Sequence, residues 1–306
     1  MSEVTGERAS KLALLRTNAL NKTMSDAHDE LPDSERLENA KGNFVRILSI
    51  AIRAKNKADG SSVDRQGIIA DTLLLRNILT GLTIHQVLHP SAIGELPKLL
   101  VPDFASVAVL ARTILESYLA MHCMAVRSFL PNEREIRLLW WDWHEVNERI
   151  RTRDNIKSKL AKLLDKTKTE LAGKIRSHAA YEMIPKKLRE GFEKGRPPTK
   201  SLFESNALIA KHAGIRMEHF DVQYQFLSSV AHSQPVIVRM LSKHEPNAPE
   251  VVISLIQALE YSAAYLAFTV RDFAELCPRA KQELDSKFQN FVALWAAIFA
   301  TAFPED

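Results

Sequence analysis

Apolar residues recur along most of this chain every three or four positions, the spacing of an amphipathic helix. Stretches rich in proline or glycine interrupt the pattern, and ten glycines in 306 residues are few for a fold that needs many tight turns. The pattern therefore predicts an all-α fold, a multi-helix bundle. The predicted helices cover about 33–57, 63–88, 104–126, 133–168, 202–213, 219–231, 251–276 and 278–303.

The segment 104–126 is the predicted centre of the bundle. It is apolar nearly all round, which is typical of a buried helix. Its only charged side chains are Arg112 and Glu116, which are four residues apart and so share one helical face. Because buried charges need hydrogen-bonded partners, a polar surface of another helix must meet this face.

Tyr224, Ser228 and His232 supply such a surface, since a spacing of four residues places them on one face. We expect the two helices to face each other, with Glu116 accepting a hydrogen bond from Tyr224 or His232. Arg112 would then be held by Glu116 and by hydroxyl groups. Two interpretations stay open. The cluster is either a buried polar network that fixes helix register, or a catalytic or ligand site. In the second case His232 does acid–base work and Arg112 stabilises negative charge on a phosphate.

These two helices also carry a resemblance. Arg112-x-x-x-Glu116, followed after an insertion by Tyr224-x-x-Leu-Ser-x-x-x-His232, resembles an uncharacterised family of bacterial all-helical proteins with R-x-x-x-E and S-x-x-x-H signatures. The similarity spans about residues 44–273. That family is in turn similar to the HEPN group (higher eukaryotes and prokaryotes nucleotide-binding domains), many of which are ribonucleases of toxin and phage-defence systems. The resemblance implies RNA binding or metal-independent RNA cleavage, and a homodimer.

The ribonuclease motif of the HEPN group, R-x4–6-H, is a separate matter. It is matched at Arg137…His144 and at Arg239…His244, which lie outside the helices of Arg112 and His232. Chance alone predicts about two such matches in a chain of this composition, so these carry no weight. Two hypotheses for the function stay open. The first is an RNA-directed protein of HEPN-like build, and the second is a non-enzymatic helical interaction protein whose polar cluster is structural.

The chain is predicted to form one domain over 33–306, preceded by a loosely docked segment, 1–32. A long polar helix over 133–168 begins with three tryptophans that should pack on the core (Trp140, Trp141 and Trp143). Beyond Arg149 its apolar stripe narrows, which is typical of a helical hairpin that projects from the body. With a return limb from Ile175 to Leu188, this inserted basic arm covers 149–200.

Charge is concentrated in the basic arm. It holds 16 Lys and Arg against 6 Asp and Glu, a balance of +10, whereas the rest of the chain holds 25 against 31. A positive surface with few aromatic residues would bind RNA through phosphates, although a solvated hairpin without a partner is the alternative. The candidate nucleic-acid-binding residues are Arg149, Arg151, Arg153, Lys157, Lys159 and Lys162.

The cysteine content and the lack of an evident targeting signal indicate where the protein is located and which cofactors it uses. Two cysteines form no disulfide framework, and neither a signal peptide nor an uncharged apolar run of 18 residues is evident. We expect a cytoplasmic protein that does not use a membrane. No phosphate-binding loop or zinc ribbon occurs, and the His85/His89 pair lacks a third ligand, so neither a cofactor nor a metal is predicted.

Overall fold

The computed structural model describes residues 31–58, 64–89, 103–152, 159–198, 200–242, 248–284 and 286–300. The predicted all-α fold is confirmed: the regular secondary structure of these ranges is helical, and their one β feature is an isolated antiparallel bridge between Ile215 and Ala300. Nearly all of the predicted N-terminal segment lies outside the described residues, and so do Arg153 and Lys157.

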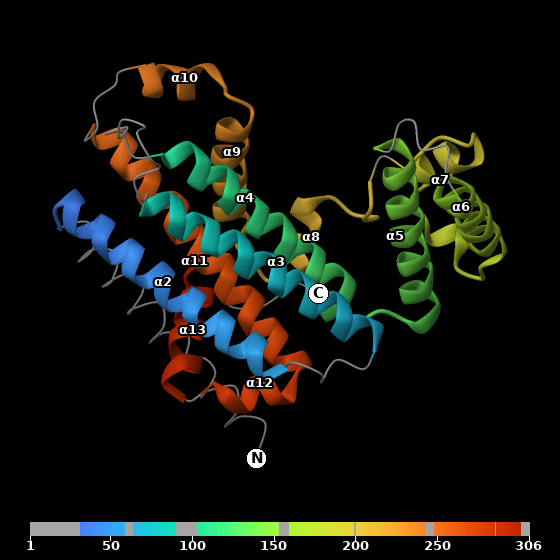
Figure 1. Ribbon diagram of the computed structural model, residues 1–306, viewed down its shortest axis with the longest axis horizontal. Coiled ribbons are helices and arrows are strands. Elements are labelled where there is room, and N and C mark those ends of the chain that lie inside the picture. The colour runs from blue at the N-terminus through green and yellow to red at the C-terminus, as the bar shows by residue number, and fades with distance from the viewer. Residues whose placement is uncertain are drawn as a thin grey trace, which may run out of the picture.

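Most of the helices form one body (Figure 1). Its long helices are α2 (Asp33–Ala58), α3 (Arg65–Leu88), α4 (Phe104–Met121) and α11 (Pro249–Leu276). A single π-helical turn, η1 (His122–Val126), extends α4. The shorter helices are α8 (Asn206–His212), α9 (Met217–Ala231), α10 (Pro235–Ser242), α12 (Pro278–Glu283) and α13 (Ser286–Phe299).

Local sequence signals explain several helix ends. Asp64 caps α3 and Asp103 caps α4, each by accepting a hydrogen bond from a backbone N–H three residues later. Pro249 opens α11, where its missing N–H costs nothing. Pro278 separates α11 from α12, as predicted. The predicted last helix, 278–303, is two helices, α12 and α13.

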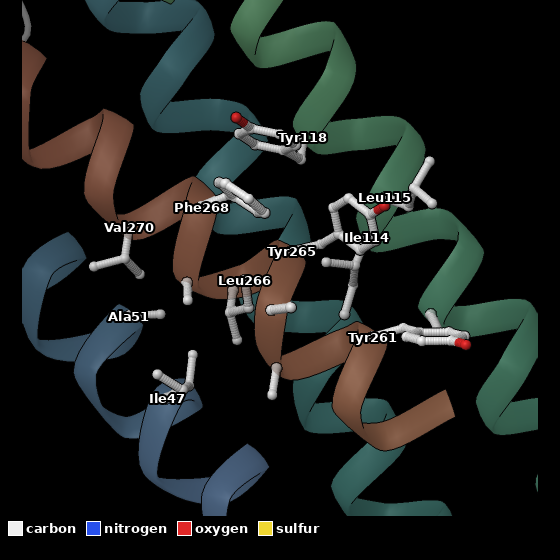
Figure 2. Close-up of a cluster of buried hydrophobic side chains, with 14 of the residues drawn as sticks. Ile47, Ala51, Ile114, Leu115, Tyr118, Tyr261, Tyr265, Leu266, Phe268 and Val270 are labelled. Atoms are coloured by element: carbon white, nitrogen blue, oxygen red, sulfur yellow. The ribbon is translucent and has the colours of Figure 1, made fainter. Parts of the chain in front are cut away.

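The centre of the body is α11 rather than α4. Nineteen of its 28 residues are buried, and it packs against α2, α3, α4 and α13. Figure 2 shows Tyr265 and Phe268 of α11 lying beside Tyr118 of α4, and Val270 beside Ala51 of α2. The apolar residues of α4 correctly indicated a buried helix. The sequence pattern of one helix does not show how many other helices surround it, so it did not identify α11 as the more central one.

Paired polar side chains fix how these buried helices lie along one another. Asn77 of α3 donates to Thr269 of α11 at 3.0 Å, and Tyr118 of α4 donates to Asp272 of α11 at 3.0 Å. An axial slip of either helix would strand these groups away from water at a cost of about 1–3 kcal/mol each. They therefore specify one register for an otherwise apolar contact.

A second unit, residues 131–198, projects from the body and is called the arm unit below (Figure 1). It contains α5 (Pro131–Arg151), α6 (Lys159–Ser177), the 3₁₀ turn η2 (Tyr181–Met183) and α7 (Lys186–Glu193). The predicted single helix over 133–168 is wrong. Two helices cover that range, and α5 and α6 pack against each other. The apolar stripe continues across the break because both helices face the same core.

That core is separate from the core of the body. It consists of ten buried residues, among them Trp140 and Trp143, whose rings lie 5.1 Å apart and both contact Phe192 of α7. The expectation that the tryptophans pack on the main core holds only for Trp141, which lies against the body cluster. The core of the arm unit therefore begins at Ile136, before the predicted start of the basic arm at Arg149.

By length and composition alone, three of the described helical segments could cross a membrane: α3, α4 with η1, and α11. The apolar windows are buried to very different degrees, 39% in α3 and 78% in α11. On α3 the uncovered part includes Ile68, Leu75 and Leu79, which lie on its outer side.

Candidate active site

Helices α4 and α9 pack against each other and bring the predicted polar faces together. The Arg112 Nε–H donates to Glu116 Oε1 at 2.9 Å. The Tyr224 hydroxyl donates to the same carboxylate oxygen at 3.4 Å. The expected hydrogen bond between Tyr224 and Glu116 is thus present, at the long end of the range.

His232 reaches the cluster from the end of α9. It follows the last helical residue, and its ring Nε2 lies 3.4 Å from Arg112 Nη1. An arginine can only donate, so this contact requires Nε2 to accept and places the ring proton on Nδ1. The partner of His232 is therefore Arg112, not Glu116.

A helix-terminating turn fixes the position of His232. Ser233 has a φ of +47°, and its N–H and that of Gln234 bond to the carbonyls of Val230 and Ser229. This is a Schellman ending, in which glycine normally takes the left-handed position. Here serine holds that strained position, which is an unusual choice. The turn directs the imidazole back toward α4.

Arg112 is the common contact of the cluster. Burial alone would lower the pKa of Arg112, but the Glu116 carboxylate outweighs that effect and the pKa is raised. The guanidinium also lies 5.4 Å from the centre of the Tyr224 ring. Its side chain keeps 20% of its exposure and that of Glu116 keeps 42%, while His232 is exposed. Solvent-borne molecules can therefore reach the cluster.

Ser228 is the one predicted member that does not join. Its hydroxyl oxygen is buried and has no hydrogen-bond partner within the described residues. It shares the face of Tyr224 and His232 by its spacing, but it makes no hydrogen bond to the polar cluster. A contact between Ser228 and Arg112, one of the hydroxyl contacts expected, is not formed.

Asn206, the first residue of α8, belongs to the site and was not predicted. Its amide donates to the Tyr224 hydroxyl at 3.2 Å. Hydrogen bonds thus run from Asn206 through Tyr224 and Glu116 to Arg112, which contacts His232. No local signal marks Asn206, because 18 residues separate it from Tyr224 and only the packing of α8 on α9 brings them together.

An open pocket of about 580 Å³ adjoins this chain of contacts. Asn206 and Tyr224 form part of its wall, together with Phe220 and Asp221 from the same turn of α9. The wall also includes His144 of α5 and Lys200, which belong to the arm unit and its return connection. The pocket therefore lies where the arm unit meets the body.

Glu204 secures this junction. Both of its carboxylate oxygens lie 3.1 Å from Arg127 Nη1, and Oε1 also accepts from Arg137 of α5 at 2.8 Å. Burial would raise the pKa of Glu204, but Arg137 and Arg127 together lower it. Burial beside the carboxylate raises the pKa of Cys123 to about 12, so this thiol stays protonated and is not a nucleophile.

The predicted nucleic-acid-binding residues are only partly described. Arg149 and Arg151 are exposed, but each forms an ion pair on its own helix, with Glu145 and Glu148 respectively. Lys162 is exposed on α6, and Lys159 begins that helix. Residues 153–158, which include Arg153 and Lys157, lie outside the described residues.

Among the described residues no group of three or more His, Cys, Asp or Glu side chains is arranged to hold a metal ion. Comparison of the chain with family models, with curated proteins and with solved structures found no match. The HEPN resemblance, the homodimer and the cytoplasmic location therefore stay predictions, and function must be argued from the site itself.

Proposed function

We propose that the protein binds single-stranded RNA and cleaves its phosphodiester backbone at the cluster of Arg112, Glu116, Tyr224 and His232. One observation carries the proposal: an arginine with a raised pKa touches a histidine at a solvent-reachable surface. A fixed cation beside a titratable base is the pair that phosphodiester cleavage by an internal hydroxyl requires.

In this proposal His232 acts as the base. When the phosphate takes the outer N–H groups of Arg112, the single lone pair of His232 Nε2 is released from its contact with Nη1. Nε2 then accepts the proton of a ribose 2′-hydroxyl, and the 2′-oxygen forms a bond to the adjacent phosphorus. The bond from phosphorus to the 5′-oxygen breaks, and that oxygen takes a proton from solvent. The products are a 2′,3′-cyclic phosphate and a 5′-hydroxyl end.

Arg112 stabilises the negative charge that develops on the phosphate oxygens. Its Nε–H is taken by Glu116, which fixes the plane of the guanidinium and leaves N–H groups on the outer nitrogens for the phosphate. Tyr224 and Asn206 act through Glu116 and are positioning residues.

The exposure of the cluster favours this function over a purely structural network. A network that only fixes register is expected to be sealed, as are the Asn77–Thr269 and Tyr118–Asp272 pairs in the core of this protein. By contrast, Glu116 is 42% exposed and His232 is exposed. Exposed polar pairs contribute little to stability, so stability alone gives little reason for this arrangement.

The test is cleavage of a fluorescently labelled single-stranded RNA by wild type, His232→Ala and Arg112→Ala. We expect each variant to lose about a hundredfold or more in rate, the usual contribution of a general base or an oxyanion donor. His219→Ala is the matched control, because it removes a second histidine from α9 away from the cluster. Equal cleavage by all four folded proteins, or no cleavage by any, would refute the proposal in favour of the structural network.

Exposed lysines of α6 supply the proposed RNA-binding surface of the arm unit. Charge reversal at Lys162 and Lys174 should weaken RNA binding and flatten its salt dependence, since each phosphate contact contributes about −0.7 to the slope of log K against log salt for single strands. Lys287→Glu on α13 makes the same charge change on the body. If Lys287→Glu weakens binding as much as the α6 variants do, the arm unit has no special role.

A further inference from the structure

The pocket at the junction of arm unit and body has a wall in common with the candidate active site. Tyr224 and Asn206 both line the pocket and both belong to the chain of hydrogen bonds that leads to Arg112. A strand of RNA at His232 would therefore pass the mouth of this pocket. At about 580 Å³ the pocket is large enough for part of a nucleotide but is not a deep cavity.

Two carboxylates line the pocket, and only one is available to a ligand. Glu204 already accepts hydrogen bonds from Arg127 and Arg137 on both oxygens. Asp221, on the exposed side of α9, forms no side-chain hydrogen bond or ion pair with any described residue. A free carboxylate offers two acceptors side by side and no donor.

Among the four RNA bases only guanine presents two neighbouring donors on one edge, its N1–H and its N2 amino group. Adenine and cytosine each place one amino group beside an acceptor nitrogen, and uracil places one N–H between two carbonyl oxygens. A carboxylate can thus form two parallel hydrogen bonds with guanine alone, and such charge-assisted pairs are the strong ones.

We propose that this pocket is a subsite for an unpaired guanine base, recognised by the carboxylate of Asp221. This inference rests on the proposed function, since it names a sequence preference for the RNA bound at the same site. The lining also includes His144, whose pKa is lowered by burial, so that the ring is neutral near pH 7. A neutral imidazole offers one N–H to the guanine O6.

The subsite does not hold the nucleotide that is cut. Asp221 and His232 are 11 residues apart on and just beyond α9, roughly 16 Å at 1.5 Å per residue. The guanine therefore lies a fixed, small number of nucleotides away from the scissile phosphate. Cleaved ends should show guanine at one constant offset, with little preference at the cut itself.

The test compares guanosine monophosphate with inosine monophosphate by isothermal titration calorimetry. The two differ only by the N2 amino group, so the phosphate contributes equally to both. We expect wild type to bind the guanine nucleotide about tenfold or more tightly, as one hydrogen bond to a charged acceptor implies. Asp221→Asn should abolish this ratio, and Glu218→Gln, an exposed acid on the same helix, should preserve it. Equal affinities in wild type, no binding of either nucleotide, or an unchanged ratio in Asp221→Asn would overturn the subsite.

Neither mononucleotide contains the bond that is cleaved, so this measurement does not depend on catalysis. Guanine preference without any RNA cleavage would keep the subsite and refute the proposed reaction. Cleavage that needs His232 but shows no guanine preference would keep the reaction and refute the subsite.

Discussion

Replacing Glu204 with glutamine should loosen the junction between the arm unit and the body. The substitution keeps the shape of the side chain but removes its charge and turns one acceptor into a donor. That donor would face Arg127 or Arg137, whose guanidinium groups can only donate. The two hydrophobic cores are separate, and this ionic contact is one of the links between the two units, beside the packing of Trp141 on the body core and the ion pair of Arg65 with Asp142.

The expected loss in the free energy of unfolding is about 2–3 kcal/mol. Breaking a buried ion pair by removing one partner costs about 3–5 kcal/mol. The expected loss lies at or below the low end of that range because Arg137, 8% exposed, keeps two hydrogen bonds to Glu133 at 3.0 and 2.8 Å. The Arg127 side chain, at 24% exposure, can turn toward water.

Acid should remove the same stabilisation from wild type. The pKa of Glu204 is lowered in the folded protein, so the carboxylate stabilises the fold above the unfolded value of 4.5. This contribution is lost as the pH falls below that value through the lower, folded pKa. The Glu204→Gln variant has no carboxyl group at this position and should lack that part of the pH dependence.

Urea unfolding measures the effect by two signals. Three of the four tryptophans lie in α5, so fluorescence mainly reports on the arm unit, whereas circular dichroism reports on all helices. Glu145→Gln is the matched control, since its ion pair with Arg149 is half exposed and should contribute about 0.5 kcal/mol or less. If Glu204→Gln loses no more stability than Glu145→Gln, the junction does not depend on this charge.

Two further predictions concern the arm unit and the turn at the site. Trp140→Ala should lower the free energy of unfolding by about 3–5 kcal/mol, because it removes a fully buried ring and its hydrogen bond to the Lys200 carbonyl. Amide hydrogen exchange should become faster in α5, α6 and α7 and not in α11. A uniform loss of protection in all helices would contradict a separate core. Ser233→Val should lower stability by about 1–2 kcal/mol, because a β-branched residue resists the positive φ of this position. If the Ser233→Val protein melts at the same temperature as the Ser233→Gly protein, the turn is not strained.

The helices could be predicted from sequence because their signals are local. Apolar spacing and capping residues such as Asp64 and Asp103 act within one or two turns, and the predicted ranges for α2, α3, α9 and α11 agree with the structure within about two residues. The same local rule placed Arg112 with Glu116 and identified a second polar face on α9.

The long-range arrangement could not be predicted in the same way. Periodicity shows which residues share a face but not what covers it, so the break between α5 and α6 and the separate core of the arm unit were missed. Ser228 shows the limit within one helix. It lies on the predicted face, yet its hydroxyl is buried without a partner in the described residues, and only Tyr224 and His232 meet Glu116 and Arg112.

The sequence by itself determined the all-α fold, the buried character of α4, and the residues from which a site could be built. These follow from side-chain spacing along a helix of 3.6 residues per turn. Only the tertiary structure decided that His232 contacts Arg112, that Asn206 and Glu204 come to the site, and that a pocket opens beside it. Each of those contacts joins residues far apart in the chain, and their distances depend on how whole helices pack.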